Sequence, residues 1–508
     1  MTAACGPEAS ATTPPSSSPA SAELAPRDPG PAAAWNYAVS VDEGFETMRV
    51  RTCWEGPAPA RFIPGRSDAA PLRGVWAVEP DGQRGAPMEW SPEGIDTLGL
   101  ASEACLDYEV DLAQGTPRGF MSGGRIEDAY LMTHSAWMWR PKRRLVRSRV
   151  DVTFDLPTDY EVSVSWPRDD GGVYHPTSNV FSMRGYLLMG KPERRSFEVA
   201  GARFEVAVAP APHRASDAGI DAWVRSAGEA VATLFGSFPV DSLQVLVIPV
   251  YAGGGDPVRF GMTARGGGPG VILLLDAGAE DEALIGEWVA VHEMLHLGMP
   301  YVRSEDAWLS EGYATYYQQV VRARAGIFPT RRRPGESPSE TQQRAALETL
   351  FDGFRRAHAR AAGPELEEAS ERMHRMGGYQ RVYWGGAALF MTLDIELRRL
   401  SGGAYGLDEL MRSVRDCCAT DGGFWSASDL LDEMRKRAAR WPAGADGEVV
   451  DARPVLDRVV GDALSARRQP AAGDTMSGVG VVEKAGEIVI SNESKESAAI
   501  RARIFSTP

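Results

Sequence analysis

The chain has 508 residues, with 54 lysines and arginines against 69 aspartates and glutamates, and its formal net charge is −15. This acidic balance argues against a nucleic-acid partner, which usually requires a basic surface. The 43% hydrophobic and 24% charged fractions are typical of a globular protein of about two to four domains. No apolar run reaches the roughly 18–20 residues of a membrane-spanning helix.

Residues 1–34 are expected to form a disordered tether, because alanine, proline, serine, threonine and glycine dominate them after Cys5. Small residues stand directly before Cys5, which resembles the end of a bacterial lipoprotein signal without its basic and apolar parts. Two interpretations stay open. Cys5 is either lipidated, on an exported, periplasmic or membrane-anchored protein, or it is an incidental cysteine in a flexible terminus.

Residues 35–210 predict an antiparallel, sandwich-like β domain. Short runs of alternating apolar and polar residues, such as 146–156, are separated by proline, glycine and aspartate turns. Cys53 and Cys105 lie in this region, either as a disulfide of an exported protein or as two unpaired thiols. Cys417 and Cys418 are neighbours in sequence, and we expect them to be poor disulfide partners.

Helices and buried strands alternate after about residue 210. We expect strands at 243–250 and 271–275, and helices over 217–234 and 281–297. The second helix carries one apolar stripe, formed by Leu284, Trp288, Val291 and Leu295. We expect it to end before Gly298 and Pro300, because glycine and proline favour helix termination. The pattern predicts a multidomain α+β protein with a catalytic domain over 211–400. A mainly helical region over 401–508 follows, with strand-like runs at 479–482 and 487–490.

The predicted helix over 281–297 contains the sequence His-Glu-Met-Leu-His at 292–296. Two histidines four residues apart project from one face of a helix, where both imidazoles can hold one zinc ion. Glu293 lies beside His292, from where it can act as general base on a metal-bound water. With seven histidines in the whole chain, this pattern is specific, and two solvated helix histidines are the weaker interpretation.

A catalytic zinc needs a third protein ligand and an open position. We expect Glu311 to supply it from a second helix, because a 14-residue return is long enough to bring it beside His292 and His296. The aromatic residues around Glu311 argue against a fully solvated side chain. Glu305 and Asp306 are weaker alternatives.

The two segments together resemble the gluzincin metallopeptidases, and most closely the glycyl aminopeptidase family, which is related to aminopeptidase N and leukotriene A4 hydrolase. The resemblance is carried by the zinc motif, by the sequence Trp-Leu-Ser-Glu-Gly-Tyr-Ala-Thr-Tyr-Tyr at 308–317, and by four further segments. These segments are Phe62–Gly65, Arg322–Gly326, Tyr383–Leu389 and Leu407–Arg412. The resemblance extends loosely over residues 35–415 and well over 285–412.

The resemblance implies a thermolysin-like catalytic domain that binds one zinc ion per chain through His292, His296 and Glu311, with Glu293 as base. It further implies a peptide or protein substrate and a tyrosine, Tyr383, that donates a hydrogen bond to the tetrahedral oxyanion. Tyr379, one helical turn earlier, is the competing candidate for that role.

The chain departs from the family pattern in three places. Relatives carry a glutamate that anchors the substrate's free amine on the strand before the zinc helix, and here the corresponding stretch reads Gly261, Met262 and Thr263. These three residues are the candidate substrate-binding segment, and Arg265 nearby either favours carboxylate-bearing substrates or is a solvated strand-end residue. The return from His296 to Glu311 is shorter than usual, and the remaining chain does not accommodate the family's PDZ domain.

Two hypotheses of different classes follow. The first is a zinc-dependent peptidase, aminopeptidase-like by family, whose exopeptidase or endopeptidase mode stays open because Thr263 replaces the amine-anchoring acid. The second is a catalytically silent surface lipoprotein that uses the peptidase fold for binding. Nothing in the sequence favours a third, a hydrolase of non-peptide amides or epoxides.

Overall fold

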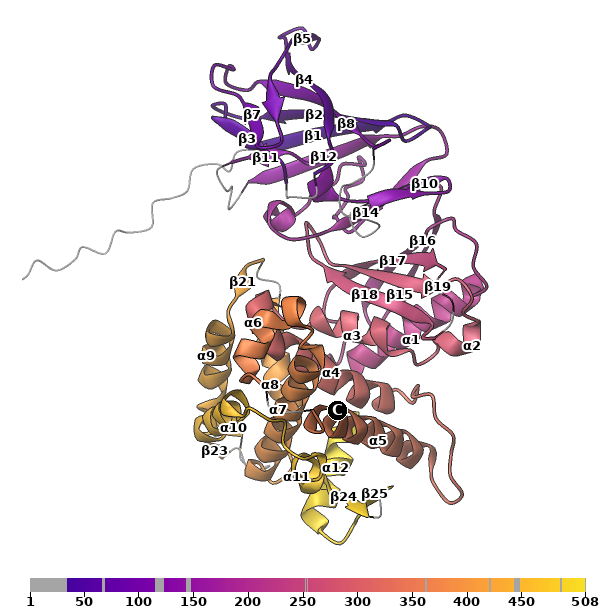
Figure 1. Ribbon diagram of the computed structural model, residues 1–508, viewed down its shortest axis with the longest axis vertical. Helices are drawn as coiled ribbons and strands as arrows, with labels where there is room; N and C mark the ends of the chain where they lie inside the picture. The colour runs from indigo at the N-terminus through magenta and orange to yellow at the C-terminus, as the bar shows by residue number, and fades with distance from the viewer. Residues whose placement is uncertain are drawn as a thin grey trace, which may run out of the picture.

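The computed structural model describes residues 34–507, apart from 66–68, 115–122, 143–147, 252, 254, 361–362, 420–421, 443–447 and 485–486. Cys5 and the expected tether up to residue 33 lie outside the described residues. Among the described helices, none is long and apolar enough to cross a bilayer. The expected multidomain architecture, with a β-rich N-terminal part and a helical C-terminal part, is confirmed (Figure 1).

The N-terminal β domain consists of three sheets, ordered β12-β1-β2-β8-β4-β5, β13-β14-β10-β9 and β11-β3-β7-β6. Its pairing is antiparallel except between β1 and β12, which run parallel. Its strands are β1 (Ala34–Val41), β2 (Thr47–Trp54), β3 (Arg61–Ile63), β4 (Leu72–Val78), β5 (Arg84–Pro87), β6 (Trp90–Ser91), β7 (Gly94–Asp96), β8 (Cys105–Asp111), β9 (Gly123–Ile126), β10 (Ala129–Thr133), β11 (Arg140–Pro141), β12 (Arg149–Asp155), β13 (Glu161–Val164) and β14 (Tyr186–Gly190).

Alternation of apolar and polar residues builds these strands. In β1 the side chains of Trp35, Tyr37 and Val39 are buried, while the residues between them face outward or are half-buried. On the neighbouring strands β2 and β8, Cys53 and Cys105 are register partners with Cα atoms 4.1 Å apart. They form a disulfide, which decides between the two interpretations of this pair.

The sheet of the expected catalytic domain, called the catalytic sheet below, has the order β15-β16-β17-β19-β18, with β18 at one edge. Its strands are β15 (Glu193–Val199), β16 (Ala202–Val208), β17 (Ser242–Val250), β18 (Val258–Ala264) and β19 (Gly270–Asp276). β16 pairs in parallel with β17, so this sheet begins before residue 211, where we expected the domain to start. The hairpin β15–β16 follows the β domain in sequence, but its strand β16 is hydrogen-bonded to β17 of the catalytic sheet.

Helices cover one face of the catalytic sheet and make up most of the C-terminal region (Figure 1). They are α1 (Asp217–Phe235), α2 (Asp281–Leu284), α3 (Trp288–His296), α4 (Ala307–Arg324), α5 (Pro338–His358), α6 (Leu366–Met376), α7 (Tyr379–Leu400), α8 (Leu407–Val414), α9 (Ala427–Ala438), α10 (Arg453–Ser465), α11 (Ala472–Met476) and α12 (Lys495–Phe505). Short strand pairs connect them, namely β20 (Tyr301–Val302) with β21 (Phe424–Trp425), β22 (Trp441–Pro442) with β23 (Val449–Val450), and β24 (Val481–Lys484) with β25 (Glu487–Ile490).

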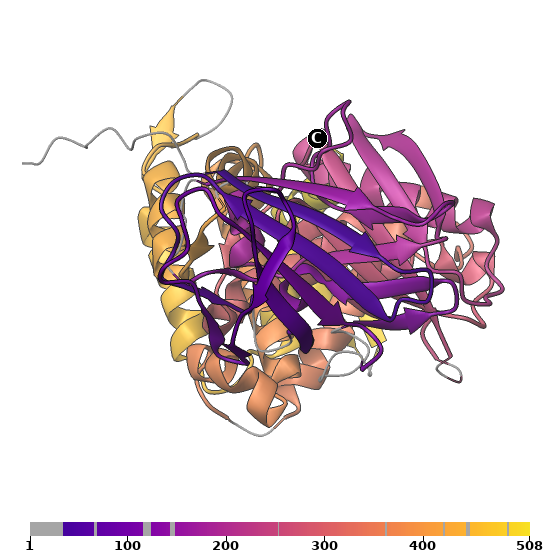
Figure 2. The same ribbon diagram turned by 90° about the horizontal axis from the view of Figure 1, so that it is seen from above.

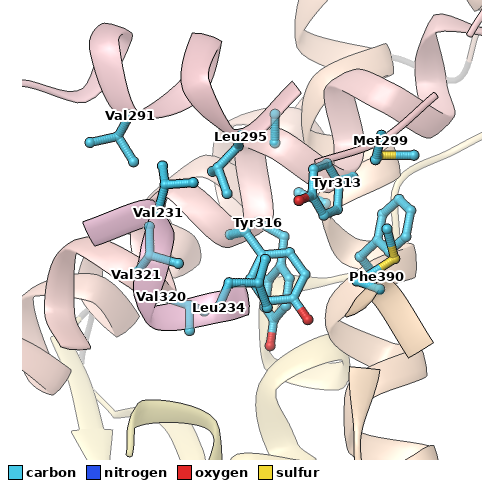
Figure 3. Packing of buried hydrophobic residues seen from close by; sticks show 14 of the residues in the cluster. Val231, Leu234, Val291, Leu295, Met299, Tyr313, Tyr316, Val320, Val321 and Phe390 are labelled. Atoms are coloured by element: carbon cyan, nitrogen blue, oxygen red, sulfur yellow. The ribbon is translucent and has the colours of Figure 1, made fainter. Parts of the chain in front are cut away.

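One hydrophobic core joins the sheet to the helices. Figure 3 shows Val291 and Leu295 of α3 packing toward Val231 and Leu234 of α1, with Tyr313 and Tyr316 of α4 beside them. Of the expected apolar stripe, Leu284, Val291 and Leu295 face the core. Trp288 does not: it is 40% exposed, and its ring lies 5.9 Å from that of His292 on the histidine face. Seen from above in Figure 2, the N-terminal β domain lies across both the catalytic sheet and the helical region.

The expected single helix over 281–297 is wrong: it is two helices, α2 and α3, separated at Gly286. Gly286 has φ +78°, a left-handed conformation that glycine adopts without a Cβ penalty, and its carbonyl accepts a hydrogen bond from Arg322 Nη2 at 2.5 Å. Glu287 then caps α3 by accepting from the amides of Val289 (2.7 Å) and Ala290 (3.2 Å). The periodic apolar stripe concealed this break, because both helices face the same core.

The second cysteine expectation is also wrong. Cys417 and Cys418 form a disulfide, within a π-helical turn at Arg415–Ala419. The trans peptide between neighbours holds their Cα atoms 3.7 Å apart, and the turn brings both sulfur atoms to the same side. The predicted run at 487–490 is confirmed as β25, and the run predicted at 479–482 begins two residues later as β24, because residues 477–479 form a 3-10 turn.

Candidate metal centre

His292, His296 and Glu311 converge on one point between α3 and α4. The Nε2 atoms of the two histidines lie 3.3 Å apart, and Glu311 Oε2 lies 3.1 Å from the first and 3.7 Å from the second. Their ligand atoms all lie within 4.8 Å of one another, close enough to share one ion. Asp306 instead accepts a hydrogen bond from the Ala427 amide at 2.8 Å, and Glu305 is exposed in the turn before α4.

Gln318 fixes the orientation of the first histidine. Its Oε1 lies 2.6 Å from His292 Nδ1, so Nδ1 carries the proton and Nε2 presents its lone pair to the site. A converging set of two imidazole nitrogens and one carboxylate oxygen is the donor chemistry of catalytic zinc sites. The residues present therefore fit a zinc ion.

Electrostatics within this cluster favour an ionised carboxylate. Burial alone would raise the pKa of Glu311, but the imidazoles of His296 and His292 outweigh burial and hold that pKa far below its ordinary value. Burial would lower the pKa of His292, and its hydrogen bond to Glu311 reverses the direction. A preformed negative charge beside two imidazoles suits a divalent cation.

Glu293 is held by the edge strand of the sheet. Its Oε2 accepts a hydrogen bond from the Thr263 amide at 2.8 Å and lies 3.1 Å from the Thr263 hydroxyl. The same hydroxyl lies 2.5 Å from the main-chain oxygen of Glu293. A Cβ at Gly261 would stand 2.7 Å from Glu293 Cγ and 2.6 Å from Val289 Cγ1. Only glycine permits β18 to approach α3 this closely.

A contact between two glycines positions Tyr383 relative to Glu311. Helices α4 and α7 cross at Gly312 and Gly386, where a Cβ on either residue would overlap the other helix's backbone. Glu311 precedes the first glycine, and Tyr383 lies nearly one turn before the second. The close crossing thereby brings a side chain of each helix to the metal cluster.

Tyr383 rather than Tyr379 faces the metal cluster. The Tyr383 ring stacks on His292, with centroids 5.9 Å apart and an interplanar angle of 4°. Burial and the nearby Glu311 carboxylate raise the pKa of Tyr383 far above its ordinary value, so its phenol keeps the proton and can donate it in a hydrogen bond. Tyr379 is 45% exposed, and its hydroxyl lies 3.4 Å from His374 Nδ1.

All three candidate substrate-binding residues, Gly261, Met262 and Thr263, lie on β18 next to this cluster. In the described residues no further strand pairs with the outer side of β18. Arg265 is not a solvated strand-end residue: it is half-buried, and its Nη2 donates to the main-chain oxygen of His296. Burial lowers its pKa to about 10, so it remains a cation at neutral pH.

Sequence reasoning missed Gln318 and the helix crossing. Gln318 follows Glu311 by seven residues, which places both on one face of α4, and that spacing was the available signal. A second group of metal-ligand side chains, Cys417, Cys418 and Glu433, is less suited to an ion. Its cysteines form a disulfide, and Glu433 already pairs with Lys436 at 2.8 Å and with Arg437.

Comparisons by sequence and by structure gave different results. No protein-family model and no curated protein matches the chain. An aminopeptidase N family protein from Idiomarina loihiensis matches with a TM-score of 0.65 and 16% identity, covering 88% of this chain and 78% of that one. A mutant M1 zinc metallopeptidase from Deinococcus radiodurans, bound to a Tyr-Ser-Ala substrate, matches with a TM-score of 0.52 and 14% identity, covering 86% and 94%.

A two-domain M1 zinc metallopeptidase mutant bound to L-arginine matches with a TM-score of 0.51 and 13% identity, over the same shares of the two chains. The chain has the M1 zinc metallopeptidase fold. This agrees with the gluzincin resemblance of the sequence, and the M1-like fold accounts for the order of β domain, catalytic sheet and helical region.

Proposed function

We propose that the chain is a zinc-dependent peptidase that binds one zinc ion through His292, His296 and Glu311. The observation that carries the proposal is the convergence of these three side chains with Glu293 and Tyr383 at the edge of the catalytic sheet. Zinc, when bound, supplies a Lewis acid that polarises water and a substrate carbonyl. The M1 zinc metallopeptidase fold supports this use of the site.

The protein's own residues perform the proton transfers. Glu293, fixed by Thr263, takes a proton from the attacking water and delivers it to the leaving amine. The Tyr383 phenol, kept protonated by burial and by Glu311, donates a hydrogen bond to the oxygen on which negative charge develops. An extended peptide pairs with the outer edge of β18, with which no further described strand pairs.

We further propose that the enzyme does not require a free substrate amine. Position 263 carries threonine, and its amide and hydroxyl both contact Glu293. The acid that would attract an ammonium group is therefore absent from this position of β18. Peptides with free and acetylated amino termini should be cleaved at rates within about threefold of each other. A much faster reaction of the free-amine peptide would refute this mode.

The test of the proposed function is hydrolysis of a peptide library, mapped by mass spectrometry, with and without a chelator. We expect cleavage that a chelator abolishes and that added zinc restores. The alternative, a catalytically silent surface lipoprotein, predicts no turnover and little bound zinc by elemental analysis. The presence of all three ligands and the base favours the peptidase, because loss of function would be expected to alter these side chains first.

An exported location is a further proposal, with membrane attachment through a lipidated Cys5. The Cys53–Cys105 disulfide supports an oxidising compartment. Fractionation of the native host, followed by mass measurement of the N-terminal peptide, tests both points. Recovery of the unmodified protein in the cytosol would contradict the export proposal.

A further inference from the structure

A cavity of about 530 Å³ lies at the start of α7, between the end of α5, α6 and the segment after α10. Its volume is in the range of small-molecule binding sites. Five arginines line it against a single acidic side chain, the arginines being Arg360, Arg372, Arg381, Arg467 and Arg468 and the acid Glu368. Such a concentration of positive charge contrasts with the chain's net charge of −15.

Most of this charge is not neutralised by the protein. Arg372 pairs with Glu368 at 2.7 Å, and Arg467 lies 3.8 Å from Glu365. Within the described part of the chain, the other three arginines of the cavity make no ion pair with a carboxylate. Arg360, Arg372, Arg467 and Arg468 are exposed at the rim. An anion approaching the cavity would meet an uncompensated positive field.

Arg381 and Gln469 line the cavity below the rim, and one donor atom of each is buried within the protein without a partner. Gln469 is 2% exposed, and its Nε2 makes no hydrogen bond. Arg381 Nε is likewise buried and unpaired, while its Nη1 lies 3.3 Å from Gln469 Oε1 and its Nη2 donates to the Ala466 carbonyl. Both atoms have almost no accessible surface, and both residues also line a smaller neighbouring cavity of about 120 Å³. What they supply to the larger cavity is therefore the fixed positive charge of Arg381.

The cavity and the zinc cluster lie on different sides of α7. Arg381 and Tyr383 are two residues apart, which is about 200° around a helix. Tyr383 faces His292, whereas Arg381 faces the segment after α10. A ligand of the cavity would therefore not occupy the peptide site.

We propose that this arginine cavity binds a small molecule that carries a diphosphate group. Guanidinium groups hold phosphate oxygens through paired hydrogen bonds, and a diphosphate concentrates several charges in a small volume. The exposed rim arginines Arg360, Arg467 and Arg468 bind the phosphate oxygens, and the Arg381 guanidinium below them adds a further fixed positive charge. Free diphosphate and a nucleoside diphosphate share this chemistry.

Isothermal titration of the full-length protein with inorganic pyrophosphate and with ADP tests the proposal. We expect binding with a Kd below about 0.1 mM for at least one of the two, and binding of citrate at least about tenfold weaker. Equal affinity for pyrophosphate and ADP identifies the diphosphate group alone as the ligand, and tighter ADP binding identifies a nucleotide. Both results support the proposal. No binding at about 1 mM, or equally tight citrate binding, would overturn it.

Variants locate the binding. The exposed double variant Arg467→Glu/Arg468→Glu should raise the Kd at least about tenfold, as should Arg381→Met. The exposed pair Arg203→Glu/Arg214→Glu carries the same change in net charge far from the cavity and should change the Kd less than about twofold. If Arg381→Met does not fold, the effect of Arg467→Glu/Arg468→Glu on the Kd still shows whether the ligand binds in this cavity.

Because diphosphates also bind zinc, the titration is repeated in His292→Ala. The proposal requires unchanged affinity there, and loss of binding in His292→Ala alone would place the ligand at the metal cluster instead.

Discussion

Thr263→Val tests whether the edge strand positions the catalytic base. Valine has nearly the shape of threonine but lacks its hydroxyl, so the contacts to the Glu293 main-chain oxygen (2.5 Å) and to Oε2 (3.1 Å) disappear. The hydrogen bond from the residue 263 amide to Oε2 (2.8 Å) remains. The variant therefore loosens the carboxylate without removing it.

The magnitude follows from the number of bonds lost. A hydroxyl has one proton and donates to one acceptor at a time, and a hydrogen bond to a charged group contributes about 1.5–3 kcal/mol. Since the amide still holds Oε2, we expect a loss at or just below the lower end of that range, about 1–2 kcal/mol in the activation free energy. This corresponds to a fall in kcat of about 5–30-fold.

The assay measures kcat and KM on a fluorogenic peptide, together with zinc content and melting temperature. Because substrate contacts are retained, we expect KM and zinc content to stay within about twofold, so the loss falls on kcat. Thr263→Ser keeps the hydroxyl and should restore kcat to within about threefold of the wild type. An unchanged kcat in Thr263→Val, or an equal loss in Thr263→Ser, would refute the positioning role.

Three further predictions concern the scaffold around the site. Gly312→Ala should lower the free energy of unfolding by about 1–3 kcal/mol, because its Cβ would overlap α7; Gly461→Ala, in open space on α10, is the control that should not lower it. Burial raises the pKa of Glu287 to about 7, so its folded state binds a proton more tightly than the unfolded chain, and stability falls by up to about 3 kcal/mol as pH rises from about 4.5 through 7. Urea unfolding at pH 5 and pH 7.5 should show this loss in the wild type and not in Glu287→Gln, in which Arg322 still faces the site; parallel losses in both proteins would disprove it. Gln318→Leu removes the partner of His292 Nδ1 and should weaken zinc affinity about 10–100-fold in a chelator competition, whereas unchanged affinity would show that Gln318 does not orient the ligand.

Local patterns in the sequence predicted the parts of the site that lie on one helix. The i, i+4 spacing of His292 and His296 predicted that both side chains project from one face of the helix. The position of Glu293 between them predicted its role as general base. The aromatic surroundings of Glu311 indicated a buried acid. Such inferences succeed because helix geometry converts spacing directly into direction.

Features that depend on tertiary packing were not predictable in this way. The break at Gly286 exists because its carbonyl meets Arg322, 36 residues away, and no local pattern reports that contact. The approach of Gly312 to Gly386 and the contact of Thr263 with Glu293 likewise join segments distant in sequence. The Cys417–Cys418 disulfide depends on a π-helical turn that the surrounding helical pattern concealed.

The most direct test of the central claim compares peptide hydrolysis by the wild type and by Glu293→Gln at equal zinc occupancy. Glutamine keeps the shape and the contact with Thr263 but cannot accept a proton, and general-base catalysis contributes about 10²–10⁴-fold. We predict a fall in kcat of at least about 100-fold, with unchanged zinc content and melting temperature. Equal rates in the two proteins, or a wild-type rate that persists after zinc removal, would contradict a zinc peptidase with Glu293 as its base.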